Sequence, residues 1–214
     1  FPELENIINN PLNYSNIVYK IGDRALITSD KLKTLKFDAN TIKNILSESK
    51  SSTGGKILKQ DLTVLKMLAQ ELLIMTKTKD KVTKYVNSMM VKTAPNLSTL
   101  VGSTIGARLI AQAGSLFKLA KLSSSGIQIL GAEKALFRSM KTGSRPPKHG
   151  ILFQHKYVHS APKRLRGKIA RTFSSKIAIA VRIDYFKGKF DKDLITKLND
   201  KVLQLLSKNN LKIT

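Results

Sequence analysis

The chain has 214 residues, of which 42% are hydrophobic, so it is long enough to bury a core in one or two domains and is not a disordered tail. Its 38 lysines and arginines against 14 acidic residues give a formal net charge of +24. The lack of cysteine excludes disulfides and cysteine-ligated metals, and the lack of a signal peptide or membrane-spanning apolar run predicts a soluble, intracellular protein.

Short helices are expected first, at residues 3–9, 12–21, 30–36 and 39–49. Ser29 and Asp38 are the predicted N-caps of the last two, because short oxygen-bearing side chains accept hydrogen bonds from the first helical amides. The chain begins at Phe1 rather than at a methionine, so we expect a fragment that lacks an N-terminal part.

One long amphipathic helix is predicted from Ile57 to about Val91, because apolar residues recur there at steps of three and four. A helix of this length needs a partner helix to cover its apolar stripe. Either residues 3–49 fold back as an antiparallel coiled-coil hairpin, or a second copy of the chain packs on the stripe, or both. The expected dimer and coiled-coil residues are Leu58, Leu62, Leu65, Leu72, Met75 and Val82.

Pro95 predicts a break after this helix, so we divide the chain into a coiled-coil dimerisation region, residues 1–91, and a second domain, residues 92–214. Asn96 is a candidate cap of the next helix. Further helices are expected at about 97–112, 115–122, 132–140, 160–186 and 190–206. Ser115 is a candidate cap, residues 123–126 are expected to form a turn, residues 142–150 a proline-containing basic loop, and residues 151–154 an extended segment. The small residues of 97–112 predict close helix packing. The fold class is all-α.

The positive charge is concentrated in the second domain. Residues 1–90 carry 14 basic and 9 acidic groups, whereas residues 91–214 carry 24 and 5. Between Lys92 and Ile183 the single acid is Glu133. Such a self-repelling surface favours a polyanionic partner, so nucleic acid is the expected ligand, the alternative being a solvated lysine-rich surface.

Within this region, Arg164, Lys168 and Arg171 follow one another at steps of four and three and therefore share one helix face. The same helix places Ile169, Phe173 and Ile177 on a different face, which is expected to be buried. Acidic residues that would pair with the cations are missing, which favours an RNA-binding ridge over a solvated face.

Known catalytic patterns are missing. Residues 52–56 are similar to a phosphate-binding loop, but Lys50 replaces its first glycine and Ile57 replaces its hydroxyl residue. His149, His155 and His159 lack the spacing of metal ligands, and acids are too scarce for a paired-carboxylate site. We therefore expect neither enzymatic activity, nor a cofactor, nor a metal in this fragment.

Seven segments resemble the Nop-domain family, and the resemblance is strongest over residues 92–189. They are residues 94–97, 106–110, 113–116, 129–138, 147–150, 166–171 and 182–186. The most specific is the string Ile129-Leu130-Gly131-Ala132-Glu133-Lys134-Ala135-Leu136-Phe137-Arg138. Within the family, the segments are most similar to the archaeal scaffold that partners fibrillarin in box C/D guide-RNA methylation complexes.

The resemblance implies a homodimeric, coiled-coil ribonucleoprotein scaffold that acts in RNA methylation and rRNA processing. Its implied partners are box C/D guide RNA with a kink-turn, a small kink-turn-binding ribosomal-type protein, and fibrillarin, which would bind a missing N-terminal domain. The location would be cytoplasmic in an archaeon and nucleolar in a eukaryote. Alternatives are a spliceosomal member of the family that binds small nuclear RNA, and a non-specific polyanion or membrane-surface binder.

The RNA contacts expected from the resemblance and the basic ridge lie in three segments. The backbone at Gly131 and Ala132 would approach phosphate at a helix N-terminus, and Glu133 would pair an arginine, accept from a base, or cap the helix. The expected contacts are Gly131, Ala132, Glu133, Lys134, Arg138, Gln154, Arg164, Lys168 and Arg171. Lys163 and Arg164 stand where archaeal relatives have aromatic residues, so recognition would depend on charge and shape.

Overall fold

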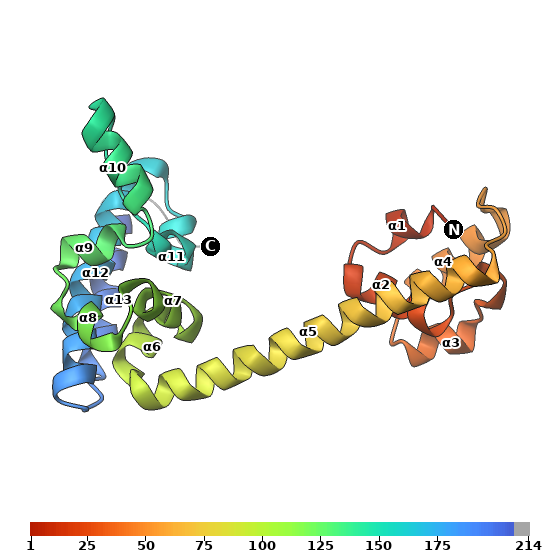
Figure 1. Cartoon of the computed structure of the whole chain (residues 1–214), viewed down its shortest axis with the longest axis horizontal. Coiled ribbons are helices and arrows are strands. Elements are labelled where there is room, and N and C mark those ends of the chain that lie inside the picture. The colour runs from red at the N-terminus through yellow and green to blue at the C-terminus, as the bar shows by residue number, and fades with distance from the viewer. Residues whose placement is uncertain (208–214) are drawn as a thin grey trace. The chain divides into compact units, whose positions relative to one another are not determined.

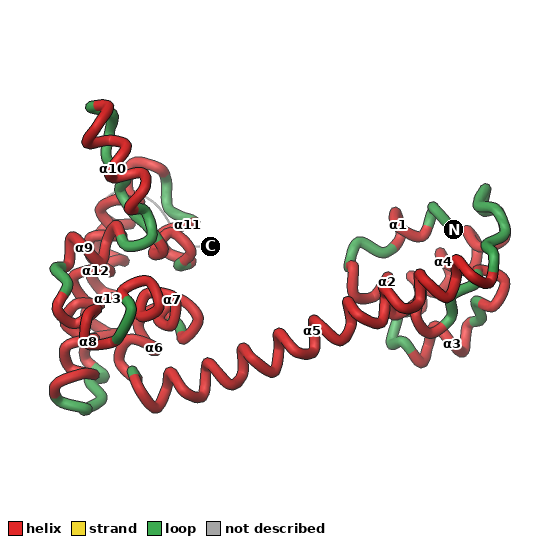
Figure 2. Tube along the Cα trace, viewed as in Figure 1, coloured by secondary structure: helices red, strands yellow, loops and turns green. Residues whose placement is uncertain are grey.

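The computed structural model describes residues 1–207, except for the side chains of Leu194, Ile195, Asn199, Val202 and Leu206. The described residues form helices and no strand, which confirms the all-α class (Figures 1 and 2). The chain divides into two compact units, Phe1–Val82 and Thr83–Thr214. The predicted boundary after residue 91 lies inside the second unit, and residues 208–214 of the predicted second domain lie outside the described residues.

The first unit contains short helices packed around their own core. They are α1 (Leu4–Ile7), α2 (Pro11–Lys20), η1 (Arg24–Leu26), α3 (Ser29–Thr34) and α4 (Ala39–Ser51). The buried side chains are Leu4, Ile8, Ile17, Ile21, Leu32, Ile42 and Ile45. Asp38 caps α4 as predicted, since its carboxylate accepts from the Thr41 amide at 3.0 Å. Ser29 is instead the first residue of α3, and Thr28 occupies the N-cap position.

The loop that resembles a phosphate-binding loop is occupied by a side chain of the protein. The Glu3 carboxylate accepts from the Ser52 hydroxyl at 2.6 Å and from the Thr53 amide at 2.9 Å. These hydrogen bonds, that of Ser52 first, lower the pKa of Glu3 to about 2. A carboxylate therefore uses the donors that a phosphate would need.

The helix α5 (Lys59–Thr93) has 35 residues, which corresponds to about 52 Å. The sequence predicted it to within a few residues at each end. Much of its apolar stripe is exposed in the single chain, including Leu58, Met75 and Val82 at 69, 69 and 55%. The first unit offers it no helix of comparable length, because α4 has 13 residues, so the coiled-coil pairing remains a prediction.

The second unit is assembled around one central helix. Its elements after α5 are α6 (Pro95–Val101), α7 (Ser103–Ala113), α8 (Leu116–Lys121), α9 (Ser124–Ile129), α10 (Glu133–Thr142), η2 (Ile151–Gln154), α11 (Lys156–His159), α12 (Lys163–Phe186) and α13 (Asp193–Ser207). The central helix α12 packs against α6, α8, α9 and α13. Its residues Ile169, Phe173 and Ile177 are fully buried, as the sequence predicted.

Several local predictions for this unit were wrong. The expected helix 97–112 is two helices, because Gly102 has a φ of +80° between α6 and α7. The expected turn at 123–126 is the start of α9, which the Ser123 hydroxyl caps through the Gly126 amide. Residues 151–154 form a 3-10 helix rather than an extended segment, and α11 was not predicted.

Other local predictions hold. The Ser115 hydroxyl accepts from the Lys118 amide at 3.1 Å and caps α8. A Cβ atom at Gly106 would lie 2.9 Å from Met90 Cε and 3.3 Å from Leu97 Cγ, so the glycine permits α6 and α7 to pack closely. This confirms the interpretation of the small residues as a packing feature.

Asn96 is not a cap, because Ala94 occupies the N-cap position of α6 and Pro95 its first turn. The N-terminus of α6 is capped from α12 instead. Asp184 is buried and accepts hydrogen bonds from the backbone amides of Asn96 and Leu97, at 3.0 and 2.9 Å. Across residues 1–207, no helix is long and apolar enough to cross a membrane.

Candidate nucleic-acid interface

The second unit contains an open groove of about 470 Å³ between α12 and the loop that follows α10. It is lined by Gln128, Arg145, Pro146, Pro147, Lys148, Arg164, Gly167, Lys168 and Arg171. Five of these residues are cationic and none is a carboxylate. The groove is therefore an anion-binding surface by composition, and the predicted ridge Arg164, Lys168 and Arg171 forms one of its walls.

This wall is rigid because the opposite face of α12 forms the core. Side chains three and four residues apart lie on one helix face, so Arg164, Lys168 and Arg171 project together while Ile169 and Phe173 are fully buried. All three cations are exposed. Like charges on one face repel each other, and a bound polyanion would relieve that repulsion.

The second wall is the loop of residues 143–150, which the prolines at 146 and 147 stiffen. Hydrogen bonds anchor it to the end of α9. The Gln128 side chain donates to the Lys148 carbonyl at 2.7 Å, and the Gly150 amide donates to the Gln128 carbonyl at 3.0 Å. A side chain on Gly150 would collide with the Leu130 carbonyl oxygen. The loop is therefore seated directly against residues 128–130.

Gly167 allows the two walls to approach each other. A Cβ atom there would lie 3.3 Å from Lys148 Cβ, so the stem of Lys148 crosses α12 where the helix has no side chain. Arg145 and Lys148 were not among the predicted contacts. Their signal was present in the sequence, since the loop is basic and fixed by prolines, but only the fold places it opposite α12.

Arg166, which lies in the same basic segment, has a structural role. Its guanidinium donates to the carbonyls of Ala161 and His159, at 2.8 and 3.1 Å, and lies 5.2 Å from the centroid of the Phe153 ring. His149 stacks on Phe153 with centroids 4.8 Å apart. Burial, followed by the charge of Arg166, lowers the pKa of His149, so this histidine is neutral at neutral pH.

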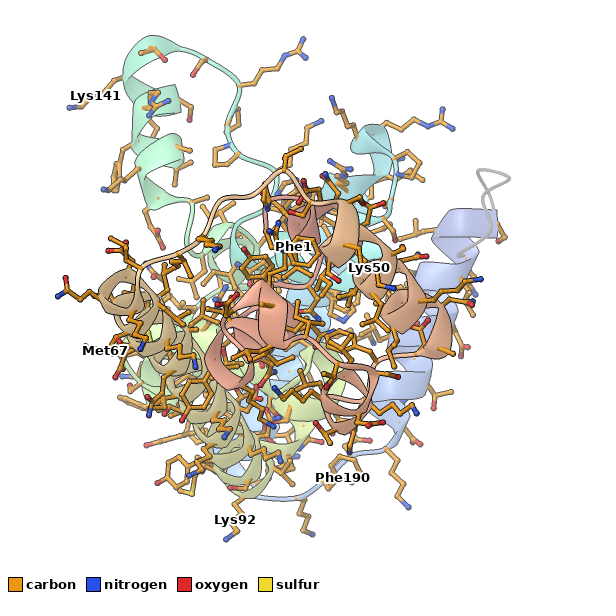
Figure 3. The ribbon with its side chains drawn as sticks, turned by 90° about the vertical axis from the view of Figure 1, so that its right-hand side faces the viewer. Phe1, Lys50, Met67, Lys92, Lys141 and Phe190 are labelled. Atoms are coloured by element: carbon orange, nitrogen blue, oxygen red, sulfur yellow. The ribbon has the colours of Figure 1, made fainter. Side chains whose placement is uncertain are left out.

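The helix α10 carries the predicted contacts Lys134 and Arg138, which are exposed and four residues apart. Figure 1 shows α10 projecting from the second unit, and Figure 3 shows the Lys141 side chain extending outward from it. Its apolar residues Phe137 and Met140 are 61 and 73% exposed. A projecting helix with mixed basic and apolar groups is suited to a composite surface rather than to bare phosphate.

The start of α10 is organised by Glu133. Its carboxylate accepts from the Gly131 amide at 2.7 Å and from the Gln112 side chain at 3.3 Å. The first of these bonds is the main cause of the lowered pKa of Glu133. The amide of Ala132 donates to the Ile129 carbonyl at 2.8 Å. Both amides expected to approach phosphate are thus bonded within the chain. Glu133 does not cap α10, because Ala132 occupies the N-cap position and makes no side-chain hydrogen bond there. The Glu133 carboxylate instead holds the turn at Gly131.

Gly131 is required by backbone geometry. Its φ is +87°, and a Cβ atom would lie 2.6 Å from Ile151 Cγ1. Direct RNA contact by residues 131–133 remains a prediction. So does contact by Gln154, whose side-chain oxygen accepts from the Arg108 guanidinium at 2.6 Å. The sequence analysis assigned no role to Arg108. Because Arg108 bonds Gln154, it would lie beside any RNA base that contacts Gln154.

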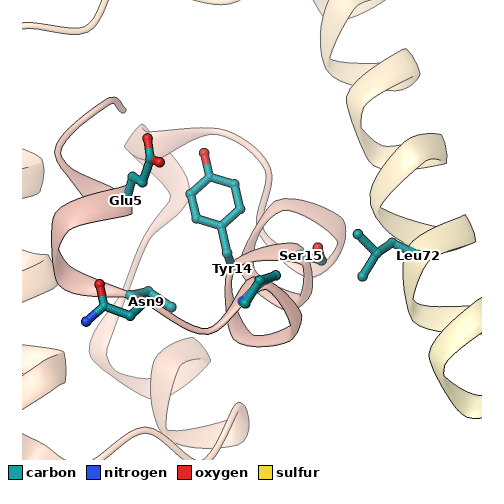
Figure 4. Close-up of a pocket in the computed structure, with 7 residues that line it drawn as sticks. Glu5, Asn9, Tyr14, Ser15 and Leu72 are labelled. Atoms are coloured by element: carbon teal, nitrogen blue, oxygen red, sulfur yellow. The ribbon is translucent and has the colours of Figure 1, made fainter. Parts of the chain in front are cut away.

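The described residues also contain a pocket outside the second unit. A pocket of about 520 Å³ in the first unit is lined by Glu5, Ile8, Asn9, Pro11, Tyr14, Ser15 and Leu72. Figure 4 shows Leu72 facing Ser15 across it. Within residues 1–207, no group of three or more histidine, aspartate or glutamate side chains could hold a metal ion.

Comparison with known proteins gives matches over nearly the whole chain. The family model described as "Nop: snoRNA binding domain, fibrillarin" matches residues 1–206. An uncharacterized NOP5 family protein of Methanocaldococcus jannaschii is 39% identical over 208 residues, 97% of this chain and 50% of that protein. Nucleolar protein 56 of Homo sapiens is 39% identical over 210 residues, 97% of this chain and 35% of that protein.

A solved structure titled as a fibrillarin/Nop5p complex aligns with 95% of this chain and 65% of that chain, at 26% identity and a TM-score of 0.48. The chain spans half or less of the length of the curated relatives just described.

Proposed function

The chain belongs to the Nop family, and from this premise we propose that it is the RNA-binding scaffold of a box C/D guide RNA 2'-O-methylation complex. In this proposal it recognises a kink-turn RNA together with the small ribosomal-type protein that holds it. The family consists of ribonucleoprotein scaffold proteins rather than enzymes. The observation that carries the proposal is the groove lined by five cations and no carboxylate.

The groove suits the sugar–phosphate backbone of a folded RNA. Phosphate contacts supply affinity and fix orientation without reading sequence, and lysine and arginine are the residues that make them. Arg164, Lys168 and Arg171 on one wall face Arg145 and Lys148 on the other. Cations on both walls can therefore contact the backbone of one RNA that lies in the groove.

The helix α10 would contact the small protein as well as the RNA. Lys134 and Arg138 supply charge, while Phe137 and Met140 expose apolar surface that has no function in binding phosphate. A surface with both charged and apolar groups fits a partner that is itself a protein bound to RNA, because such a partner offers phosphates and apolar side chains together. The scaffold would then bind the complex more tightly than either component.

Two further partners are proposed. Self-association would cover the exposed apolar stripe of α5, on which Met75 and Val82 lie one heptad apart. Fibrillarin would bind through a part of the protein beyond this chain, since the relatives are about twice its length or more. The location would be cytoplasmic in an archaeal host and nucleolar in a eukaryotic one.

A binding assay at one fixed salt concentration tests the scaffold role. The chain is titrated with a labelled kink-turn RNA, with the small kink-turn-binding protein, and with the preformed complex of the two. We expect the preformed complex to bind at least about tenfold more tightly than RNA alone, which corresponds to about 1.4 kcal/mol. Equal affinity for naked RNA and for the complex would show a non-specific polyanion binder instead.

A further inference from the structure

A second surface of the second unit combines exposed aromatic rings with cations. The rings of Phe117 on α8 and Tyr185 on α12 have centroids 5.2 Å apart, and Tyr185 and Phe186 have centroids 4.9 Å apart in an edge-to-face arrangement. Their exposed fractions are 38, 45 and 66%. We name these three residues the aromatic shelf.

Leaving these rings in water has a cost. Burial of an aromatic side chain stabilises a fold, and this chain has 8 phenylalanines, 5 tyrosines and no tryptophan. Three of so few aromatic residues nevertheless gather, exposed, at one place. Soluble proteins that expose contiguous aromatic surface commonly use it for binding. The contiguous exposure of these rings therefore favours a binding role for the shelf.

The charges around the shelf identify the chemistry of that ligand. The two segments that form it, residues 116–122 and 182–189, carry Lys118, Lys121, Arg182, Lys187 and Lys189. Their one carboxylate, Asp184, is buried and accepts from Asn96 and Leu97. Lys121 Nζ already lies 4.2 Å from the centroid of the Phe117 ring. Aromatic rings on two segments that are rich in cations match a nucleic acid strand, which offers flat bases and negative phosphates.

The shelf is held rigid by an arginine. Arg182 donates to the carbonyls of Ala120 and Leu122, at 3.2 and 3.3 Å, and so fixes the end of α8 against α12. These hydrogen bonds fix the position of the Phe117 ring relative to the Tyr185 ring. A preformed platform loses little freedom on binding, which favours stacking of unpaired bases.

We propose that the aromatic shelf binds single-stranded RNA, with bases stacked on Tyr185 and Phe186 and phosphates held by the surrounding lysines. The shelf is distinct from the groove. Tyr185 follows Lys168 by 17 positions on α12, which is about 25 Å along the helix axis. One RNA could place its folded part in the groove and an unpaired extension on the shelf. The inference goes beyond the proposed function and does not require it.

Fluorescence of a Phe186→Trp variant tests the stacking directly, because the chain has no other tryptophan. A short single-stranded RNA is expected to quench the indole emission on binding, whereas inorganic polyphosphate, which has charge but no bases, is not. A Tyr85→Trp variant is the matched control, since Tyr85 is 65% exposed on α5 and lies outside the shelf. Unchanged indole emission of the Phe186→Trp variant at RNA saturation, or equal quenching by polyphosphate, overturns the proposal.

A Tyr185→Leu/Phe186→Leu double variant separates stacking from general apolar contact. The two leucines keep an apolar surface but remove the aromatic rings on which bases would stack. Affinity for single-stranded RNA should therefore fall roughly fivefold or more at fixed salt. Affinity for a fully paired RNA hairpin should not change. Wild-type affinity for single strands in this variant contradicts the proposal. So does a loss confined to self-association in light scattering, which would make the shelf a protein contact.

An Arg164→Ala/Lys168→Ala/Arg171→Ala variant keeps the two proposals distinguishable. It removes one wall of the groove and leaves the shelf intact. When Phe186→Trp is combined with these three changes, single-stranded RNA should still quench the indole emission. Loss of the quenching would mean that RNA reaches the shelf only from the groove, and the shelf would then not be an independent site.

Discussion

The Asp184 carboxylate on α12 accepts hydrogen bonds from both the backbone amide and the side-chain amide of Asn96 on α6, at 3.0 and 2.7 Å. Asn96 in turn donates to the Lys189 carbonyl at 2.7 Å and accepts from the Asp191 amide at 2.7 Å. This pair joins the start of α6, the end of α12 and the segment leading to α13. Residues that are 88 positions apart in sequence thereby hold the second unit together.

Replacement of Asp184 with alanine should therefore destabilise the second unit. The change leaves the amides of Asn96 and Leu97 buried without acceptors, and each such group costs about 1 to 3 kcal/mol. We expect a loss of about 3 kcal/mol or more in the free energy of unfolding, measured by urea denaturation. Asp200→Ala, at an exposed carboxylate of α13, is the control and should change it by less than about 0.5 kcal/mol. A comparable loss in both variants would refute the role of the pair.

A Gly131→Ala substitution should disturb the junction between α9 and α10. The left-handed φ of +87° disfavours alanine, and the new methyl group would overlap Ile151. The control is Gly143→Ala, because Gly143 also has a positive φ, +67°, but faces open space. We expect the first to cost at least about 1 kcal/mol more than the second in thermal or urea unfolding. Equal costs would mean that the contact with Ile151 does not constrain the site.

Removal of the groove wall should change the salt dependence of RNA binding. In the Arg164→Ala/Lys168→Ala/Arg171→Ala variant, three phosphate contacts are lost. The slope of log K against log salt concentration should become shallower by about 2, at roughly 0.7 for each contact. A triple alanine variant of Lys31, Lys33 and Lys43, exposed lysines of the first unit, controls for net charge. An equal change in both would show that total charge, not the groove, determines affinity.

The hydrogen bond from the Gly131 amide to the Glu133 carboxylate predicts a pH dependence of local order. Its pKa is lowered, chiefly by the hydrogen bond from the Gly131 amide. The folded state therefore gains stability that is present above the ordinary glutamate pKa and is lost as pH falls through the lower folded value. In NMR spectra the Gly131 amide should shift on acidification through that range. In Glu133→Gln, which keeps an acceptor but does not ionise, the shift should be absent. An unchanged titration in that variant would assign it to another group.

The exposed stripe of α5 predicts self-association. Met75 is 69% exposed, and a lysine there would place charge in an interface with a second copy. We expect the wild-type chain to be a dimer at tens of micromolar in light scattering and Met75→Lys to shift it toward monomer. Gln70→Lys adds the same charge on the opposite side of the helix and should leave the dimer intact. A wild-type monomer would contradict the proposal.

Much of the fold followed from local patterns. The extent of α5 and α12, the caps at Asp38 and Ser115, and the buried face of α12 were all predicted, because side-chain spacing and capping chemistry act over a few residues. The errors have different origins. The break at Gly102 and the cap at Ser123 are local features that the apolar spacing did not reveal. Residues 150 and 151, by contrast, bond the carbonyls of Gln128 and Leu130, so a tertiary contact decided the backbone there.

For the candidate site, the sequence by itself determined the charge of the second unit, the ridge Arg164, Lys168 and Arg171, and the family. These properties depend on composition and on the fixed geometry of one helix. Only the tertiary structure decided that Arg145 and Lys148 face this ridge and that Arg166 bonds the carbonyls of Ala161 and His159 instead of lining the groove. The physical reason is that the geometry of a helix fixes which of its own side chains share a face. Which side chain of another element lies opposite that face depends on how the whole core packs.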